Sequence, residues 1–340
     1  MLRHKFLQFA FLHLISVISA AQINFSDILY DVSPFIIVYK NGTVSRLLGT
    51  AVVPPSPNPA AAAGVRSKDI RIDPRRNIAA RLFLPETAAA GGKKLPLLVY
   101  FHGGAFVTES AFSPTYHNYL SSVAREANIV VVSVNYRLAP ENPLPIGYDD
   151  SWRALEWAFG KGGRAEPWLR DHVDFNKVYI GGDSAGGNIA HNMAIRAGLD
   201  KTGRVSIAGM FLNCPHFWGN KPIGERGDEF RVELMKKIWL VAYPNSPNGF
   251  DNPDSNPGLD PNLSKLGCKR VLVYVAEKDV LRARGLYYVK KLRASGWKGD
   301  ARVVDVKGEG HVFNLLAPNT TKAKAMMDDV ASFFNGGHAL

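Results

Sequence analysis

Hydrophobic positions along the chain fall into short unbroken runs separated by amphipathic stretches. Five runs have the length of strands and are rich in Val and Ile: residues 95–102, 128–137, 177–183, 205–213 and 269–279. Such near-continuous hydrophobicity predicts strands buried on both faces, as in a parallel sheet that is covered by helices.

The stretches between these runs space their hydrophobic residues as helices do. The predicted helices cover residues 116–126, 148–159, 188–197, 281–295 and 322–334, and one more strand is expected at residues 302–306. Alternating strands and helices predict one doubly wound α/β domain over residues 22–340, with a mostly parallel sheet and helices on both faces.

Two segments depart from this alternation. In the N-terminal arm, about residues 22–60, the apolar stretch 34–39 precedes an Asn41-Gly42 turn, which predicts a short hairpin. Residues 215–261 hold one helix-like stretch, 229–241, followed by many turn residues. We expect this insertion and the arm to form a cap over the strand ends.

Composition and charge agree with a globular protein. Of 340 residues, 46% are hydrophobic, which is enough for a sizeable core. The net charge of +11 is scattered as single Lys and Arg residues, so we interpret it as a solvated surface. No run of like charge is long enough to suggest an arm that binds nucleic acid.

The first 21 residues read as a secretory signal peptide cleaved after Ala21, because Arg3 and Lys5 precede an apolar run and a small-residue end. Secretion is therefore expected. The alternative is an uncleaved anchor or a misplaced start codon in a cytoplasmic protein. The run is too short to span a bilayer stably. Entry into the secretory pathway agrees with Asn-x-Ser/Thr triplets at Asn24, Asn41, Asn262 and Asn319.

The chain has two cysteines, Cys214 and Cys268, each in or beside an apolar run. We expect both to be buried free thiols rather than a disulfide. No cluster of Cys and His has the spacing of a zinc site, and no metal or cofactor is expected.

The glycine-rich stretch GGDSAGG, residues 181–187, joins a predicted strand to a predicted helix. A phosphate loop would need Lys after its last Gly, and a dinucleotide site would need G-x-G-x-x-G spacing; neither fits. Gly182, Ser184 and Gly186 do form G-x-S-x-G, which predicts a nucleophilic serine on a sharp turn whose neighbours must be small. The alternative is a tight turn with an idle serine.

A serine nucleophile needs a base, and the base needs an orienting acid; in this arrangement the chain order is Ser, acid, His. Three histidines follow Ser184: His216, His311 and His338. His311 lies in a glycine-flanked loop before the last helix and is the predicted base, with a surface or structural role as the alternative. His216 could line a pocket instead, and His338 is at the terminus.

The acid is expected where the strand 269–279 ends. Asp279 lies at the junction with the next helix and is the predicted partner of His311, although it could also cap that helix. Glu277, still within the strand, is the alternative.

Acyl transfer also needs donors for the developing oxyanion. The loop FHGGAF offers the backbone N–H groups of Gly103 and Gly104, which we expect to act with that of Ala185, while His102 fixes the loop. Three aromatic residues are predicted either to line the substrate pocket or to pack the cap onto the body: Phe217, Trp218 and Phe250.

Taken together, these motifs resemble the hormone-sensitive-lipase group of α/β-hydrolases, and more closely its plant carboxylesterases. FHGGAF, VNYRLAPENPLP, GDSAGGNIAHN, VAEKDVLRARG and GEGHVF occur in family order, and the resemblance runs from about residue 25 to the end. It implies an α/β-hydrolase fold, a triad of Ser184, Asp279 and His311, and oxyanion donors at Gly103, Gly104 and Ala185. The leader departs from most members, which look cytosolic.

The resemblance also frames the function. The family includes a gibberellin receptor that has lost the catalytic histidine and a hydroxyisoflavanone dehydratase with threonine in place of the serine. His311 and Ser184 are both present here, which favours a serine carboxylesterase acting on small or medium esters. The alternatives are a lyase or transesterase of specialised metabolism on the same site and a small-molecule receptor.

Overall fold

The computed structural model describes residues 27–58, 64–90, 92–225, 227 and 229–337. The predicted signal peptide, the triplet at Asn24 and His338 lie outside the described residues.

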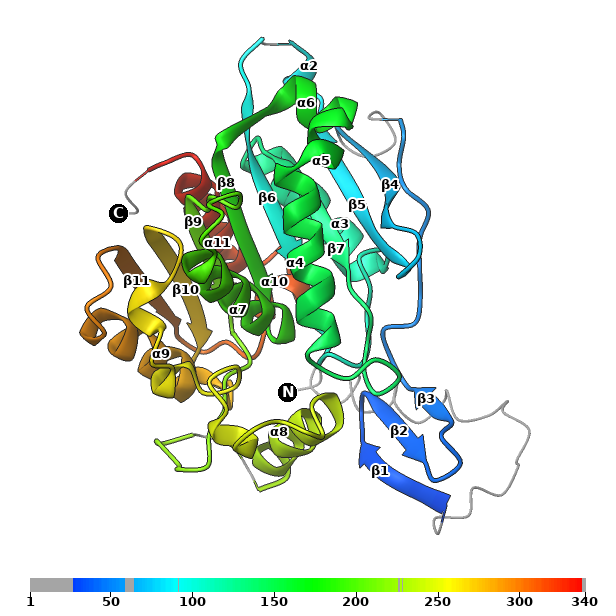
Figure 1. Cartoon of the computed structure of the whole chain (residues 1–340), viewed down its shortest axis with the longest axis vertical. Helices are drawn as coiled ribbons and strands as arrows, with labels where there is room; N and C mark the ends of the chain where they lie inside the picture. The colour runs from blue at the N-terminus through cyan, green and yellow to red at the C-terminus, as the bar shows by residue number, and fades with distance from the viewer. Residues whose placement is uncertain (1–26, 59–63, 91, 226, 228, 338–340) are drawn as a thin grey trace, which may run out of the picture.

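An eight-stranded sheet forms the centre of the molecule, in the order β11-β10-β9-β8-β6-β7-β5-β4 (Figure 1). The strands from β6 to β11 run parallel, whereas β5 pairs antiparallel with β7 and β4 antiparallel with β5. This confirms the predicted mostly parallel α/β sheet. The strands are β4 (Val65–Asp73), β5 (Ile78–Pro85), β6 (Leu95–Phe101), β7 (Val130–Asn135), β8 (Val173–Asp183), β9 (Gly209–Asn213), β10 (Arg270–Ala276) and β11 (Asp300–Val306).

The two antiparallel strands were not predicted, because charged residues interrupt their hydrophobic pattern. Arg81 sits in the middle of β5 and yet is only 1% exposed. Its guanidinium donates to both carboxylate oxygens of Asp69 on β4, over 2.7 and 2.9 Å. Pairing across the two strands therefore allows a charge to lie inside an otherwise buried strand.

Helices cover both faces of the sheet (Figure 1). The side of β6 that presents Leu97 and Val99 packs in one core with α4, α7 and α9. The side that presents Leu98 and Tyr100 packs with α3 and α11. These helices are α3 (Pro114–Glu126), α4 (Ile146–Phe159), α7 (Ala185–Leu199), α9 (Arg282–Ala294) and α11 (Thr321–Phe334); shorter ones are α2 (Thr87–Ala90), α5 (Lys161–Ala165), α6 (Pro167–His172) and α10 (Phe313–Leu316).

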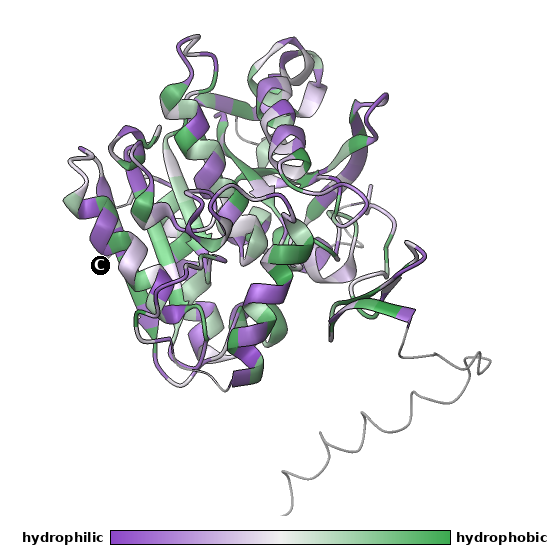
Figure 2. Ribbon diagram, turned by 60° about the horizontal axis from the view of Figure 1, so that its bottom comes forward, coloured by the Kyte–Doolittle hydropathy of each residue, from purple (hydrophilic) through white to green (hydrophobic). Residues whose placement is uncertain are grey.

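Burial on both faces explains why the strands read as unbroken apolar runs. Figure 2 shows the central strands in the colours of hydrophobic residues, while the surrounding helices alternate between hydrophobic and hydrophilic positions. Among the helices that the structure describes, none combines the length and apolar character needed to cross a membrane.

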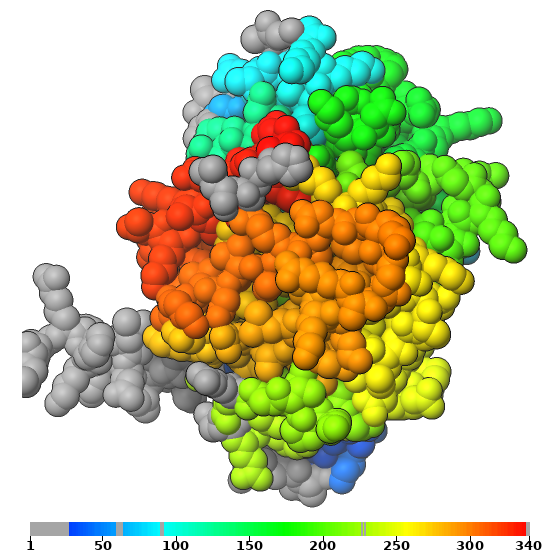
Figure 3. All heavy atoms as spheres, turned by 90° about the vertical axis from the view of Figure 1, so that its left-hand side faces the viewer, coloured from blue at the N-terminus to red at the C-terminus, as the bar shows by residue number. Residues whose placement is uncertain are grey.

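The N-terminal arm forms a separate three-stranded sheet of β1 (Ile28–Val32), β2 (Ile36–Tyr39) and β3 (Val44–Arg46), and the predicted Asn41-Gly42 turn joins β2 to β3. It lies beside α8 (Glu229–Ala242) at one end of the molecule (Figures 1 and 3). Arg46 ties this sheet to the body: it donates to the carbonyl of Val107 over 2.8 Å and pairs with Glu141 over 2.7 Å.

Candidate active site

Ser184 occupies the turn between β8 and α7 with a left-handed backbone, φ 50° and ψ −118°. The helix begins at Ala185, three residues before the predicted start. The Ser184 N–H donates to the carbonyl of Asn213 over 2.9 Å, and its carbonyl accepts from the N–H of His216 over 2.8 Å. The segment after β9 thus holds the serine in a conformation that non-glycine residues rarely adopt.

At two positions of this turn, the neighbouring backbone lies too close for any residue other than glycine. A Cβ at Gly186 would lie 1.9 Å from the carbonyl oxygen of Phe101, and a Cβ at Gly182 would lie 2.3 Å from the backbone of Gly186. At Gly181 and Gly187 the nearest atoms would be 3.0 and 3.1 Å away, which is tight packing rather than collision. Gly182 and Gly186 therefore make room for the bend at Ser184, while Gly181 and Gly187 allow close packing around it.

Asp279 and His311 are joined by a hydrogen bond of 2.7 Å between Oδ2 and Nδ1. An ionised carboxylate can only accept, so Nδ1 carries the hydrogen and Nε2 is left as an acceptor. The other oxygen of Asp279 accepts from the N–H of Leu281 over 3.0 Å, but the helix begins at Arg282 with Leu281 at its N-cap position, so Asp279 does not cap it as the alternative expected. His311 lies in the loop between β11 and α10, as predicted.

The two groups reinforce one another electrostatically. Desolvation lowers the pKa of His311. The charge and hydrogen bond of Asp279 outweigh this effect and raise the pKa well above its usual value. Burial works to raise the pKa of Asp279, but His311 holds it below its usual value. The pair is therefore built to stabilise a protonated imidazole.

Cys214 lies beside this pair and, like Cys268, is a buried free thiol, as predicted. Burial raises the pKa of the Cys214 thiol, which keeps it neutral next to Asp279. Among the described residues, Cys214, Asp279 and His311 also form the one cluster whose ligand atoms, within 4.8 Å of one another, could gather around a metal ion. Because the carboxylate and imidazole already bond to each other, we interpret the cluster as an acid–base pair with a thiol neighbour.

Glu277 and His102 do not belong to the Asp279–His311 pair. The carboxylate of Glu277 accepts from the N–H of Gly308 over 2.8 Å and pairs with Lys307, away from His311. His102 is buried, stacks on Tyr136 at 4.3 Å and hydrogen-bonds the carbonyl of Gly103, as its predicted structural role requires.

The prediction that Gly103 is an oxyanion donor is wrong. Its N–H donates to the hydroxyl of Tyr116 over 2.7 Å and to Asp183 over 3.2 Å, so it points into a buried network. Gly104 and Ala105 instead line the cavity that contains Ser184. Among the described residues, neither of their N–H groups has a backbone acceptor.

A buried network that sequence reasoning missed fixes the glycine loop to the serine turn. Asp183 accepts hydrogen bonds from the hydroxyls of Tyr100 and Tyr116, each over 2.8 Å. Burial raises the pKa of Asp183 to about 6, although these hydroxyls oppose the shift. The sequence contains one sign of this network. Asp183 is an acidic residue directly before the serine, at the end of a strand whose neighbouring residues are apolar.

We expect Tyr116→Phe to destabilise the protein by about 1–3 kcal/mol, because it removes one buried hydrogen bond from the Gly103 N–H and one from the Asp183 carboxylate. The loop should also be held less firmly, so kcat should fall more than KM rises. Urea unfolding and steady-state kinetics measure both effects. Tyr119→Phe, one turn along α3, is the matched control; equal behaviour of the two variants would contradict the anchoring role.

Ser184, Asp279 and His311 all line one cavity of about 550 Å³. Many of its wall residues are apolar. They come from the arm, from α8, from the segment after β10 and from the α10 region: Phe35, Leu48, Leu234, Met235, Ile238, Val280, Leu281, Val312, Leu315 and Leu316. The volume and lining are those of a small-molecule site.

The predicted pocket lining by Phe217, Trp218 and Phe250 is wrong, since none of them reaches the cavity. Phe217 is 1% exposed and packs on Tyr288, with ring centroids 5.0 Å apart. Trp218 packs behind Val280 with Phe250. These residues take the alternative role, packing the insertion onto the body.

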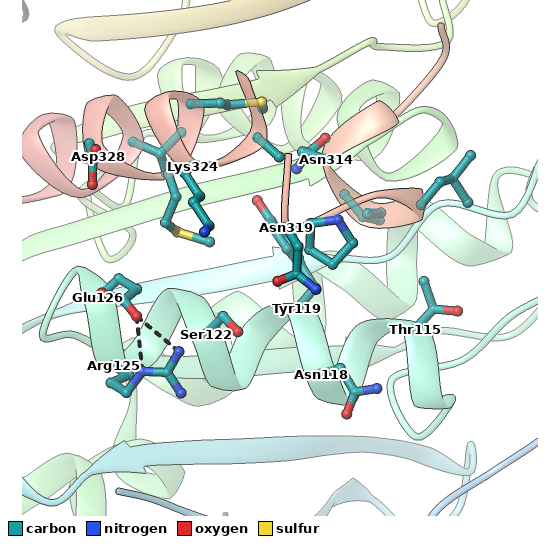
Figure 4. Close-up of a pocket in the computed structure, with 17 residues that line it drawn as sticks. Thr115, Asn118, Tyr119, Ser122, Arg125, Glu126, Asn314, Asn319, Lys324 and Asp328 are labelled. Atoms are coloured by element: carbon teal, nitrogen blue, oxygen red, sulfur yellow. Dashed lines mark hydrogen bonds and ion pairs between the residues drawn. The ribbon is translucent and has the colours of Figure 1, made fainter. Parts of the chain in front are cut away.

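A second cavity, of about 630 Å³, lies between α3 and the α10–α11 segment (Figure 4). It shares Thr115, Leu315 and Leu316 with the first cavity but contains none of the three predicted catalytic groups. In Figure 4, Arg125 and Glu126 pair with each other on its rim. The three predicted catalytic groups therefore all lie at the smaller of these two cavities.

Comparisons with known proteins show the family of this chain. A family model described as the alpha/beta hydrolase fold matches residues 98–315. Probable carboxylesterase 13 of Arabidopsis thaliana is 46% identical, covering 92% of this chain and 99% of its own. The 2-hydroxyisoflavanone dehydratase of Glycyrrhiza echinata is also 46% identical, covering 89% and 95%. The solved Pyrobaculum calidifontis esterase is 30% identical, with a TM-score of 0.67 over 80% of this chain and 85% of that one.

Proposed function

This chain belongs to the α/β-hydrolase family and is a carboxylic ester hydrolase of the plant carboxylesterase group, and from that premise we propose that it cleaves small to medium esters through an acyl-enzyme. Ser184 is the nucleophile, His311 the base and Asp279 the orienting acid. The observation that carries the proposal is the 2.7 Å hydrogen bond between Asp279 and His311 in the cavity that holds the strained Ser184.

In the first half of the reaction, the Ser184 hydroxyl attacks the ester carbonyl and its proton passes to Nε2 of His311. Asp279 accepts the Nδ1 hydrogen throughout and stabilises the imidazolium. His311 then gives its proton to the leaving alcohol, and the acyl group remains on Ser184. In the second half, water attacks the acyl-enzyme with His311 as base, which releases the carboxylic acid and restores the serine.

The oxyanion formed in each half needs preorganised donors. We assign this role to the backbone N–H groups of Gly104, Ala105 and Ala185. Ala185 is the first residue of α7, and the N–H groups of a first helical turn have no partner within the helix. The helix dipole adds favourable charge at the same point.

The walls favour substrates with an apolar body. Residues of the arm and of α8 line the cavity, which supports the proposal that these two segments set substrate choice. Phe35 and the aliphatic side chains of α8 take the place of the predicted Phe217, Trp218 and Phe250. Short acyl groups on aromatic or terpenoid alcohols fit a cavity of about 550 Å³. For localisation, we retain the proposal of secretion on the basis of the leader alone.

The pH dependence of ester hydrolysis tests this assignment. His311 must be neutral to accept a proton, so kcat/KM should rise with pH through the pKa of His311, which lies well above the usual 6.5. Burial lowers the pKa of both His102 and His216 to about 4, so their titration falls outside this window. The measurement is kcat/KM for a p-nitrophenyl ester from acidic to mildly alkaline pH. A rise that ends below pH 6.5 would contradict His311 as the base.

Elimination is the second candidate, because one relative at 46% identity is named a dehydratase. Both reactions would use His311 and the oxyanion donors, but only hydrolysis forms an acyl group on Ser184. Product analysis separates them: a lyase would release an unsaturated product without the acid that hydrolysis yields.

A further inference from the structure

A second imidazole lies in the wall of the proposed active site. His216 follows β9, is 1% exposed and lines the cavity together with Ser184. Its N–H donates to the carbonyl of Ser184 over 2.8 Å, and its carbonyl accepts from the side chain of Asn188 over 3.0 Å. The position of this residue is therefore fixed relative to the proposed nucleophile.

Both ring nitrogens of His216 lack a hydrogen-bond partner within the described part of the chain. The ring meets the edge of Phe106, at 5.6 Å between centroids, and its two nitrogens are buried in the wall of the cavity that the residue lines. A neutral imidazole has one donor and one acceptor, and burying either of them without a partner is unfavourable. A bound ligand can supply the missing hydrogen bond.

His216 can hold a polar group without disturbing the proposed catalytic base. Burial lowers its pKa to about 4, and the charge of His311 adds to the decrease. The ring thus stays neutral when His311 takes up a proton, and the two imidazoles do not repel each other as cations.

A second unpaired polar atom lines the same cavity. Oε2 of Glu109 is buried without a hydrogen-bond partner among the described residues. The arm presses on this side chain, since a Cβ at Gly49 would lie 3.0 Å from its carboxyl carbon. A carboxyl oxygen can accept a hydrogen bond, so a hydroxyl group can supply the missing partner.

We propose that the cavity selects esters that carry a free hydroxyl group, which hydrogen-bonds to the ring of His216, with Glu109 as a second acceptor. A hydroxyl both donates and accepts, so it suits either nitrogen of the imidazole and the carboxylate alike. The aliphatic side chains of α8 hold the apolar part of such a substrate. This inference rests on the proposed esterase function and narrows its substrate class.

The test compares kcat/KM within two matched substrate pairs. The first pair is p-nitrophenyl butyrate and its β-hydroxylated analogue, which places the hydroxyl on the acid. The second is phenyl acetate and catechol monoacetate, which places it on the alcohol. The native protein should prefer the hydroxylated ester of at least one pair. His216→Phe should lower that preference about 10-fold, the effect of one lost hydrogen bond, and His216→Gln should restore part of it.

His191→Phe is the matched control. His191 is also a fully buried histidine, but it bonds the hydroxyl of Tyr288 in the core and does not line the cavity. The same exchange there should leave the preference at its native value, with thermal melting to verify that both variants fold.

Different outcomes overturn different claims. No preference in the native protein, or equal preferences in His216→Phe and the native protein for both pairs, would overturn the hydroxyl inference and leave the esterase proposal standing. A parallel change in His191→Phe would show that the effect comes from the core. Failure of the folded native protein to hydrolyse any of the four esters would overturn the esterase proposal and this inference together.

Discussion

Ser184→Ala should lower kcat for ester hydrolysis by about 10⁶-fold, because removal of the nucleophile disables the whole triad. Alanine keeps the Cβ of serine, so the left-handed turn and the bonds of its backbone to Asn213 and His216 are preserved. The loss should therefore appear in kcat without loss of fold. Steady-state hydrolysis of a p-nitrophenyl ester, with a melting curve, measures both.

A fluorophosphonate probe gives an independent readout, since it labels activated serines only. Native protein should be labelled and Ser184→Ala should not. Ser206→Ala is the control, because Ser206 is exposed and far along the chain from the site. Absence of labelling in native folded protein would remove the case for a serine enzyme and favour a receptor.

Asp279→Asn should lower kcat by about 10⁴-fold. The amide of asparagine can donate a hydrogen bond to Nδ1, which favours the tautomer with the hydrogen on Nε2 and leaves no base for the serine proton. Loss of the carboxylate charge should also lower the pKa of His311, so the rise of kcat/KM with pH should move to lower pH.

Glu277→Gln is the matched control for this prediction. Glu277 lies two residues away, with the same carboxylate chemistry, but it pairs with Lys307 at the surface. The variant should keep the native pH profile and a kcat within about 2-fold of native, since exposed ion pairs contribute little. A comparable loss in both variants would contradict the assignment of Asp279.

The elements of the fold were predictable where burial leaves a mark on local sequence. The parallel strands β6 to β10 are largely buried on both faces and so appear as apolar runs, whereas the edge strand β11 is mostly half-buried. The β4–β5 pair was not predicted, because the burial of Arg81 depends on its ion pair with Asp69. That ion pair forms only when the two strands pair.

The candidate site was likewise predictable only where its residues leave a signal in the local sequence. Ser184, Asp279 and His311 carry local signals: a glycine-rich turn, a strand end and a glycine-flanked loop. The oxyanion donors do not, because three successive N–H groups follow His102 and their directions depend on the loop backbone. Tyr116, from the next helix, captures the N–H of Gly103 and so leaves Gly104 and Ala105 facing the cavity.

The sequence by itself thus determined the α/β architecture and the three proposed catalytic side chains, because strand periodicity and turn chemistry act over a few neighbouring residues. Only the tertiary structure decided that Gly104 and Ala105 line the cavity while the N–H of Gly103 does not face it. It also decided that Phe217 and Trp218 pack in the interior while α8 lines the cavity, and that the unpaired nitrogens of His216 lie in the cavity wall. The direction of a side chain is set by contacts with residues distant in sequence, and no local pattern records them.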